Sequence, residues 1–93
     1  MSRKERIRAS LSAALNPTEV EIVDESKLHE GHAGAAPGGE THYRVRLVSE
    51  TFAGQSRVAR QRAVYAALDA EFACGLHALS LATLTPDEAK TAR

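Results

Sequence analysis

Near the N-terminus, hydrophobic residues recur every three to four positions, as they do on one face of a helix. The residues of this stripe are Ile7, Leu11, Ala14 and Leu15. Ser2 and Glu5 have the spacing of a capping box, so we expect the helix to begin at Arg3. Asn16-Pro17 should end it, because the residue before a proline avoids the helical conformation.

Two stretches in which hydrophobic and polar residues alternate come next, and each predicts a strand with one buried face. The first covers residues 19–24 and the second covers residues 41–49. The inward residues of the second strand are expected to be Tyr43, Val45 and Leu47. Residues 25–40 between the strands form a long glycine-rich loop, and loops of this length in small domains commonly carry function.

A second helix is predicted from Arg57 to about residue 73, with Ser56 as its N-cap. Its buried stripe is expected to be Val58, Tyr65, Leu68 and Phe72. Gly75 should stop this helix, and residues 76–83 alternate again as a third strand. The capping box Thr85-Pro86-Asp87-Glu88 predicts a short final helix.

The predicted order is helix, strand, strand, helix, strand, helix, in a single domain that covers residues 1–93. We expect an α+β fold with a three-stranded mixed sheet and helices on one face. The first two strands can pair antiparallel across their loop, while the second and third, joined through a helix, should be parallel with a right-handed crossover. His42, the loop before it and His77 should therefore meet at one end of the sheet.

The composition excludes several classes of protein. The chain has 93 residues with 12 basic and 12 acidic side chains, so its net charge predicts neither a nucleic acid nor an acidic partner. A single cysteine excludes an internal disulfide and suits a reducing compartment. No apolar run suggests a membrane span or a secretion signal, so we expect a cytoplasmic protein that does not bind membranes. No nucleophile elbow or other catalytic set stands out, so we do not expect an enzyme.

The histidines are the candidate metal ligands. Taken singly, His77, His29 and His32 are each best explained as ordinary surface or hydrogen-bonded residues. The predicted topology would gather them at one edge, where imidazoles can form an incomplete metal site. Cys74 has C-x-x-H spacing to His77, but we interpret it as a small apolar residue in the last helical turn. An iron–sulfur cluster at this edge would need thiolates from a partner.

Basic residues suggest a second kind of partner. Arg57, Arg60 and Arg62 crowd the start of the second predicted helix, where cations oppose the helix dipole. Folding does not require them there, so they predict contact with an anion such as a nucleic-acid phosphate. Arg44 and Arg46 add positive charge on the sheet. The alternative is a solvated face balanced by acids, and few aromatic residues are free to stack on bases.

Six short segments, spread over nearly the whole chain, match one family in order and in spacing. They are V-D-E-S at 23–26 followed by His29, G-E-T-H-Y at 39–43, L-V-S at 47–49, F-A-G at 52–54, R-Q-R-A-V-Y at 60–65 and L-H-A-L-S-L at 76–81. With these segments the chain resembles the BolA family. The resemblance implies a BolA fold, which is similar to the class II KH domain.

The resemblance also implies a partner and a cofactor. Family members bind monothiol glutaredoxins with a CGFS active site and share with them, and with glutathione, a bridging [2Fe–2S] cluster. The family contributes the histidine of its H-A-L motif, here His77, and a residue of the loop before the second strand. Since that loop has no cysteine, the chain resembles the subgroup with a loop histidine, here His29 or His32. Members act in iron–sulfur cluster trafficking or iron regulation.

Some bacterial members of the family are described as DNA-binding transcriptional regulators, which makes DNA a second candidate partner. The family often has R-H-R where this chain has Arg60-Gln61-Arg62, so a glutamine stands in place of an imidazole. Without a partner, we expect the chain to be a monomer or a weak homodimer.

Overall fold

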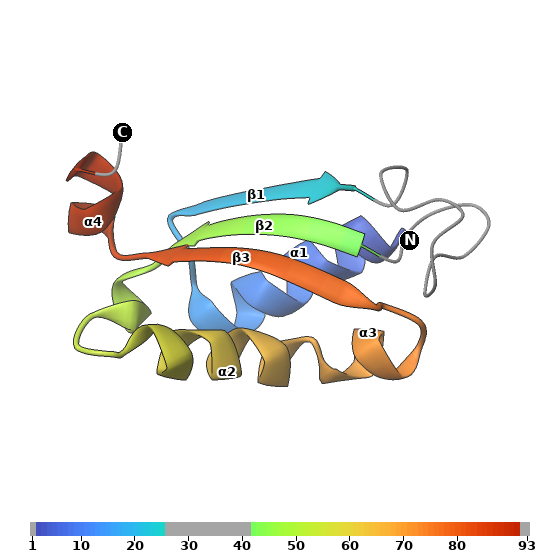
Figure 1. The fold of residues 1–93 in the computed structure, drawn as a ribbon. Helices are drawn as coiled ribbons and strands as arrows, with labels where there is room; N and C mark the ends of the chain where they lie inside the picture. The colour runs from blue at the N-terminus through green and yellow to red at the C-terminus, as the bar shows by residue number, and fades with distance from the viewer. Residues whose placement is uncertain (1, 26–41, 92–93) are drawn as a thin grey trace.

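The computed structural model describes residues 2–25 and 42–91 (Figure 1). Its elements are α1 (Arg3–Leu15), β1 (Glu19–Asp24), β2 (His42–Val48), the 3-10 helix η2 (Glu50–Phe52), α2 (Arg57–Ala67), α3 (Asp69–Ala73), β3 (Ala78–Leu84) and α4 (Pro86–Thr91). This is the predicted order, with the second helix divided in two. Among the described residues, no helix is long and apolar enough to cross a membrane.

The three strands form one mixed sheet in the order β1-β2-β3. β1 and β2 pair antiparallel, with Glu19 opposite Val48, whereas β2 and β3 pair parallel, with His42 opposite Ala78. Figure 1 shows α1, α2 and α3 on one face of the sheet and α4 beyond the end of β3. The predicted α+β fold with a mixed sheet is therefore confirmed, and the starts of β2 and β3 lie at the same end.

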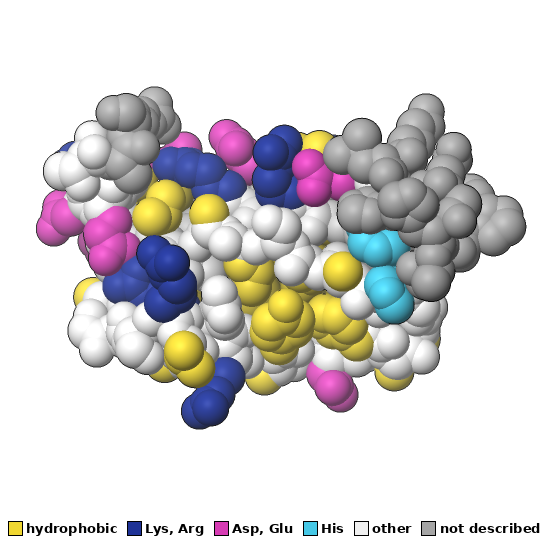
Figure 2. Space-filling model, in the orientation of Figure 1, with side chains coloured by type: hydrophobic (Ala, Val, Ile, Leu, Met, Phe, Trp, Pro, Cys, Tyr) yellow, Lys and Arg dark blue, Asp and Glu magenta, His cyan; other side chains and the backbone are white. Residues whose placement is uncertain are grey.

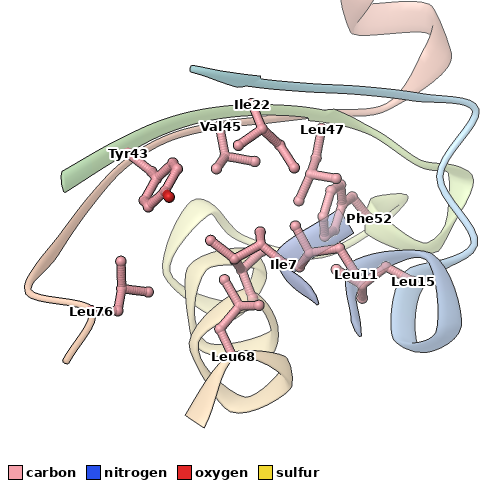
Figure 3. Packing of buried hydrophobic residues seen from close by; sticks show 11 residues of the cluster. Ile7, Leu11, Leu15, Ile22, Tyr43, Val45, Leu47, Phe52, Leu68 and Leu76 are labelled. Carbon is pink, nitrogen blue, oxygen red and sulfur yellow. The ribbon is translucent and has the colours of Figure 1, made fainter. Parts of the chain in front are cut away.

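The core lies between the sheet and the helices (Figure 3). Its fully or almost fully buried side chains include Ile7, Leu11, Tyr43, Val45, Leu47, Phe52, Val64 and Leu68. The inward residues predicted for α1 and β2 are buried except Ala14, which is exposed on α1. Each large buried side chain contributes about 1.5–3 kcal/mol by leaving water. This core fixes the register of β2 and with it the position of His42.

The second predicted helix differs from expectation in two ways. It breaks at Leu68, a fully buried residue whose amide donates to the carbonyl of Tyr65 as well as that of Val64. No glycine or proline marks this break; tertiary packing of the buried Leu68 accompanies it. The predicted burial of Val58 and Tyr65 is wrong, since they are 55% and 41% exposed, because the core-facing side of α2 presents Val64 instead.

Candidate metal-ligating edge

His77 is placed by the turn that ends α3. The amide of Leu76 donates to the carbonyl of Glu71 at 2.9 Å, and that of Gly75 to the carbonyl of Phe72 at 3.4 Å. These two bonds and the positive φ of Gly75, 114°, form a Schellman-type helix end. Leu76 is buried in the core while His77 is exposed. The turn uses residues 75–77, so β3 begins at Ala78 rather than at the predicted residue 76.

Two arginines of α1 hold this turn in place. Arg6 forms a two-pronged pair with the buried carboxylate of Glu71, through bonds of 2.9 and 3.1 Å. Arg3 lies 3.4 Å from the same carboxylate and donates from Nη2 to the carbonyl of Cys74 at 2.8 Å. Cys74 itself is exposed and lies at the C-cap of α3, one residue beyond the last helical turn. The contacts of α1 therefore fix the residues that precede His77.

His42 and His77 meet at the end of the sheet where β2 and β3 begin, which we call the histidine edge. Their ring centroids lie 5.1 Å apart at an interplanar angle of 52°. His42 is 8% exposed, whereas the imidazole of His77 is exposed and makes no hydrogen bond within the described part of the chain. Figure 2 shows the two histidine side chains next to each other on the surface. The prediction that these residues converge is confirmed.

The other predicted ligands, His29 and His32, lie outside the described residues. The described residues on either side of this segment lie together, because the amide of Glu25 donates to the carbonyl of His42 at 2.8 Å. Glu25, His42 and residues 78–80 also line a small surface pocket. Within residues 2–25 and 42–91, no three side chains of histidine, cysteine or acid type cluster as a complete metal site. The described edge offers an accessible imidazole and needs further ligands.

The predicted basic residues differ in what surrounds them. Arg60 is almost buried: its guanidinium donates to the carbonyls of Gln55 and Thr83, both at 3.0 Å, and pairs with Glu88 at 2.6 Å. The hydrogen bond from Arg60, together with one from the amide of Thr85, lowers the pKa of Glu88 to about 2. The expectation that Arg60 contributes free positive charge at the helix start is therefore wrong.

The remaining four basic residues are more accessible. Arg57 and Arg62 are exposed on α2. Arg44 and Arg46 lie on the sheet, where Arg44 is 3.6 Å from a carboxylate oxygen of Glu25 and Arg46 is 3.7 Å from one of Glu19. Among the described residues of the predicted patch, Arg57 and Arg62 are therefore exposed cations on α2, while Arg44 is exposed beside Glu25. Figure 2 shows Lys and Arg side chains on this face of the molecule, some of them close to acidic ones.

Sequence reasoning missed the ionic contacts that position the edge. Arg3 and Arg6 are spaced to share one helix face, which is a signal that was available, but the sequence does not say which acid they meet. Glu71 lies among the residues of a helical stripe and reads as an ordinary surface acid. Its burial follows only from the break at Leu68 and the approach of α1.

Comparison with known proteins places these features in one family. The family model described as "BolA-like protein" matches residues 11–88. The chain is 46% identical over 91 residues to SufE-like protein 1, chloroplastic/mitochondrial, of Arabidopsis thaliana; the match covers 94% of this chain but 24% of that protein. It is 41% identical to the DNA-binding transcriptional regulator BolA of Escherichia coli, over 95% of this chain and 80% of the regulator. The solved BolA domain of Arabidopsis SufE1 superposes with a TM-score of 0.85 at 45% identity, over 95% and 96% of the two chains.

Proposed function

Because this chain belongs to the BolA family, we propose that it is a non-enzymatic adaptor that binds a monothiol glutaredoxin and shares a bridging [2Fe–2S] cluster with it and with glutathione. The cluster would be cargo for iron–sulfur trafficking or a signal for iron regulation. In this proposal His77 is the main ligand from this chain, and His29 or His32 is the second. The partner and glutathione supply the thiolates.

The observation that carries the proposal is the exposed imidazole of His77 at this end of the sheet, which makes no hydrogen bond to any residue that the structure describes. An imidazole ligand has to be neutral and reachable from outside the protein. Mixed histidine and cysteine ligation is an established way of holding a [2Fe–2S] cluster. Cys74 is the one cysteine of the chain, so this protein cannot provide a full thiolate set and a partner has to contribute.

Both loop histidines are within covalent reach of this edge. His29 follows Glu25 by four residues and His32 follows it by seven, and extended chain spans at most ~3.5 Å per residue. Their α-carbons can therefore lie no further than ~14 Å and ~25 Å from that of Glu25. The shorter tether favours His29, while His32 remains compatible.

The test is co-expression with a CGFS glutaredoxin, followed by absorption and circular dichroism of the purified complex. His77→Ala should change or abolish the visible bands of the cluster, while Ser80→Ala, which alters an exposed residue of the same edge, should leave them unchanged. His29→Ala and His32→Ala then identify the second ligand. Because a protonated imidazole cannot ligate, acidification should release the cluster. Spectra unaffected by His77→Ala would refute the assignment.

A second candidate function is nucleic-acid binding. The E. coli relative is named a DNA-binding transcriptional regulator, and Arg57 and Arg62 are exposed on one helix. Neutralised phosphates release counterions, so binding of labelled duplex DNA should weaken steeply with salt. Arg57→Ala and Arg62→Ala should each reduce the slope of log binding constant against log salt concentration by about one, whereas Lys4→Ala on α1 should not. Binding that is insensitive to salt, or equally affected by Lys4→Ala, would contradict this role.

A further inference from the structure

The two outer strands of the sheet differ in how they are protected. β1 and β3 are the edges, because the strand order is β1-β2-β3 (Figure 1). β1 carries Glu19, Glu21 and Asp24 among its six residues. β3 has the sequence A-L-S-L-A-T-L, with no charge, proline or glycine. Natural proteins usually protect an exposed edge with such residues, so the β3 edge has the character of a strand-pairing surface.

The hydrogen bonds at the end of β3 show which of its backbone groups face outward. The amide of Ser49, which follows β2, donates to the carbonyl of Leu84 at 2.9 Å, so this carbonyl points toward β2. The carbonyl of Thr83 accepts instead from Arg60, on another element. Successive residues of a strand alternate in direction. The backbone groups of Leu79 and Leu81 therefore turn away from β2, as those of Thr83 do.

Arg60 limits the part of this edge that another strand can use. Its guanidinium covers the outward carbonyl of Thr83. Residues 78–82 remain, and within the described part of the chain the backbones of Leu79 and Leu81 make no hydrogen bond outside the sheet ladder. The available edge is therefore five residues long and presents the backbone groups of two leucines.

These five residues, Ala78-Leu79-Ser80-Leu81-Ala82, read the same in both directions. We propose that two copies of this chain pair antiparallel through the β3 edge, with a two-fold axis at Ser80. An isologous interface needs a surface that is complementary to itself, and a palindromic strand without charges meets this requirement at every position. The proposal does not depend on the cluster or on a glutaredoxin.

The register that the palindrome predicts agrees with the directions of the backbone groups of β3. Pairing about Ser80 places Leu79 of one copy opposite Leu81 of the other, which are the residues whose backbone groups face outward. Each of these pairs would exchange both hydrogen bonds, while the two Ser80 residues form a non-hydrogen-bonded pair. The leucine side chains, half-buried against the core, would extend the apolar layer beside α2, where Figure 2 shows hydrophobic side chains gathered.

The first experiment measures mass in solution. Analytical ultracentrifugation of the full chain, from micromolar to millimolar concentration, should show a reversible monomer–dimer equilibrium. Ser80→Lys would place two ammonium groups together at the axis and should weaken the dimer at least about tenfold. The matched change Ser12→Lys, on an exposed site of α1, should have no effect. A chain that stays monomeric throughout, or a dimer that Ser80→Lys leaves intact, would overturn the proposal.

The second experiment tests the register in a Cys74→Ser background. Ser80→Cys should form a disulfide-linked dimer on mild oxidation, because α-carbons of a non-hydrogen-bonded pair lie about 4.5 Å apart, within disulfide range. Ala82→Cys should not link to itself, since its two copies would be about 13 Å apart. A mixture of Ala78→Cys and Ala82→Cys should link. Self-linking by Ala82→Cys as efficient as by Ser80→Cys would reject the two-fold at Ser80.

Discussion

Glu71 is the residue through which α1 holds the turn before His77. Its removal should therefore destabilise the fold more than the removal of an ordinary exposed acid of a helix does. Glu71→Ala deletes the two-pronged pair with Arg6 and the 3.4 Å contact with Arg3. The side chain of Arg6 is 39% exposed and can regain water, whereas that of Arg3 is 12% exposed and cannot do so fully. The cost therefore lies mainly in lost charged hydrogen bonds and in the partial burial of Arg3.

We expect Glu71→Ala to lower the free energy of unfolding by about 2–3 kcal/mol, in the range measured for hydrogen bonds to charged groups. For a domain of this size, that corresponds to a fall in Tm of about 10–20 °C. Glu71→Gln keeps the shape and one acceptor, and it should lose roughly half as much. Glu21→Ala, which removes an exposed acid of β1, should change stability by no more than about 0.5 kcal/mol.

Thermal and urea unfolding followed by circular dichroism would measure these differences. A double-mutant cycle with Arg6→Ala should give a coupling energy of at least about 1 kcal/mol between Arg6 and Glu71. A Tm for Glu71→Ala within about 2 °C of that for Glu21→Ala would show that the carboxylate does not hold α1 to α3 and would refute the reasoning.

Two further changes test a contact next to Glu71 and an ion pair at the other end of β3. Gly75→Ala should lower the free energy of unfolding by about 1–3 kcal/mol, because φ is 114° and the new methyl group would lie 3.4 Å from Nη2 of Arg3. Gly54→Ala, at φ 77° with no atom within 4 Å, should lower it less. An equal loss for the two variants in urea unfolding would contradict the close contact. The pKa of Glu88, lowered to about 2 from 4.5 mainly by Arg60, means that its ionised form stabilises the fold fully above pH 4.5 and progressively less as pH falls toward 2. Wild-type protein should therefore be more stable than Glu88→Gln at neutral pH, and the difference in urea midpoint should shrink between pH 4.5 and 2; a difference that stays constant would contradict the ion pair.

The parts of this structure that follow from local rules could be predicted from sequence. Capping boxes at Ser2 and Thr85 form as expected, with side chains and amides bonded reciprocally. The meeting of His42 and His77 needed one more step, the rule that strands joined through a helix run parallel. That rule fixes which ends of the strands coincide, even though the two residues are far apart in sequence.

The ionic contacts that the sequence did not reveal depend on which charged side chain finds which partner across the fold. Arg60 has the sequence context of an anion site, with Ser56 before it and no acid in the first turn of α2. In the structure, Glu88 reaches it from α4, and the same carboxylate caps its own helix by accepting from the amide of Thr85. A single acid thus satisfies a local rule and a long-range one, and only the local rule is visible in sequence. The same ion pair sets the length of the accessible β3 edge, because Arg60 is held over the carbonyl of Thr83.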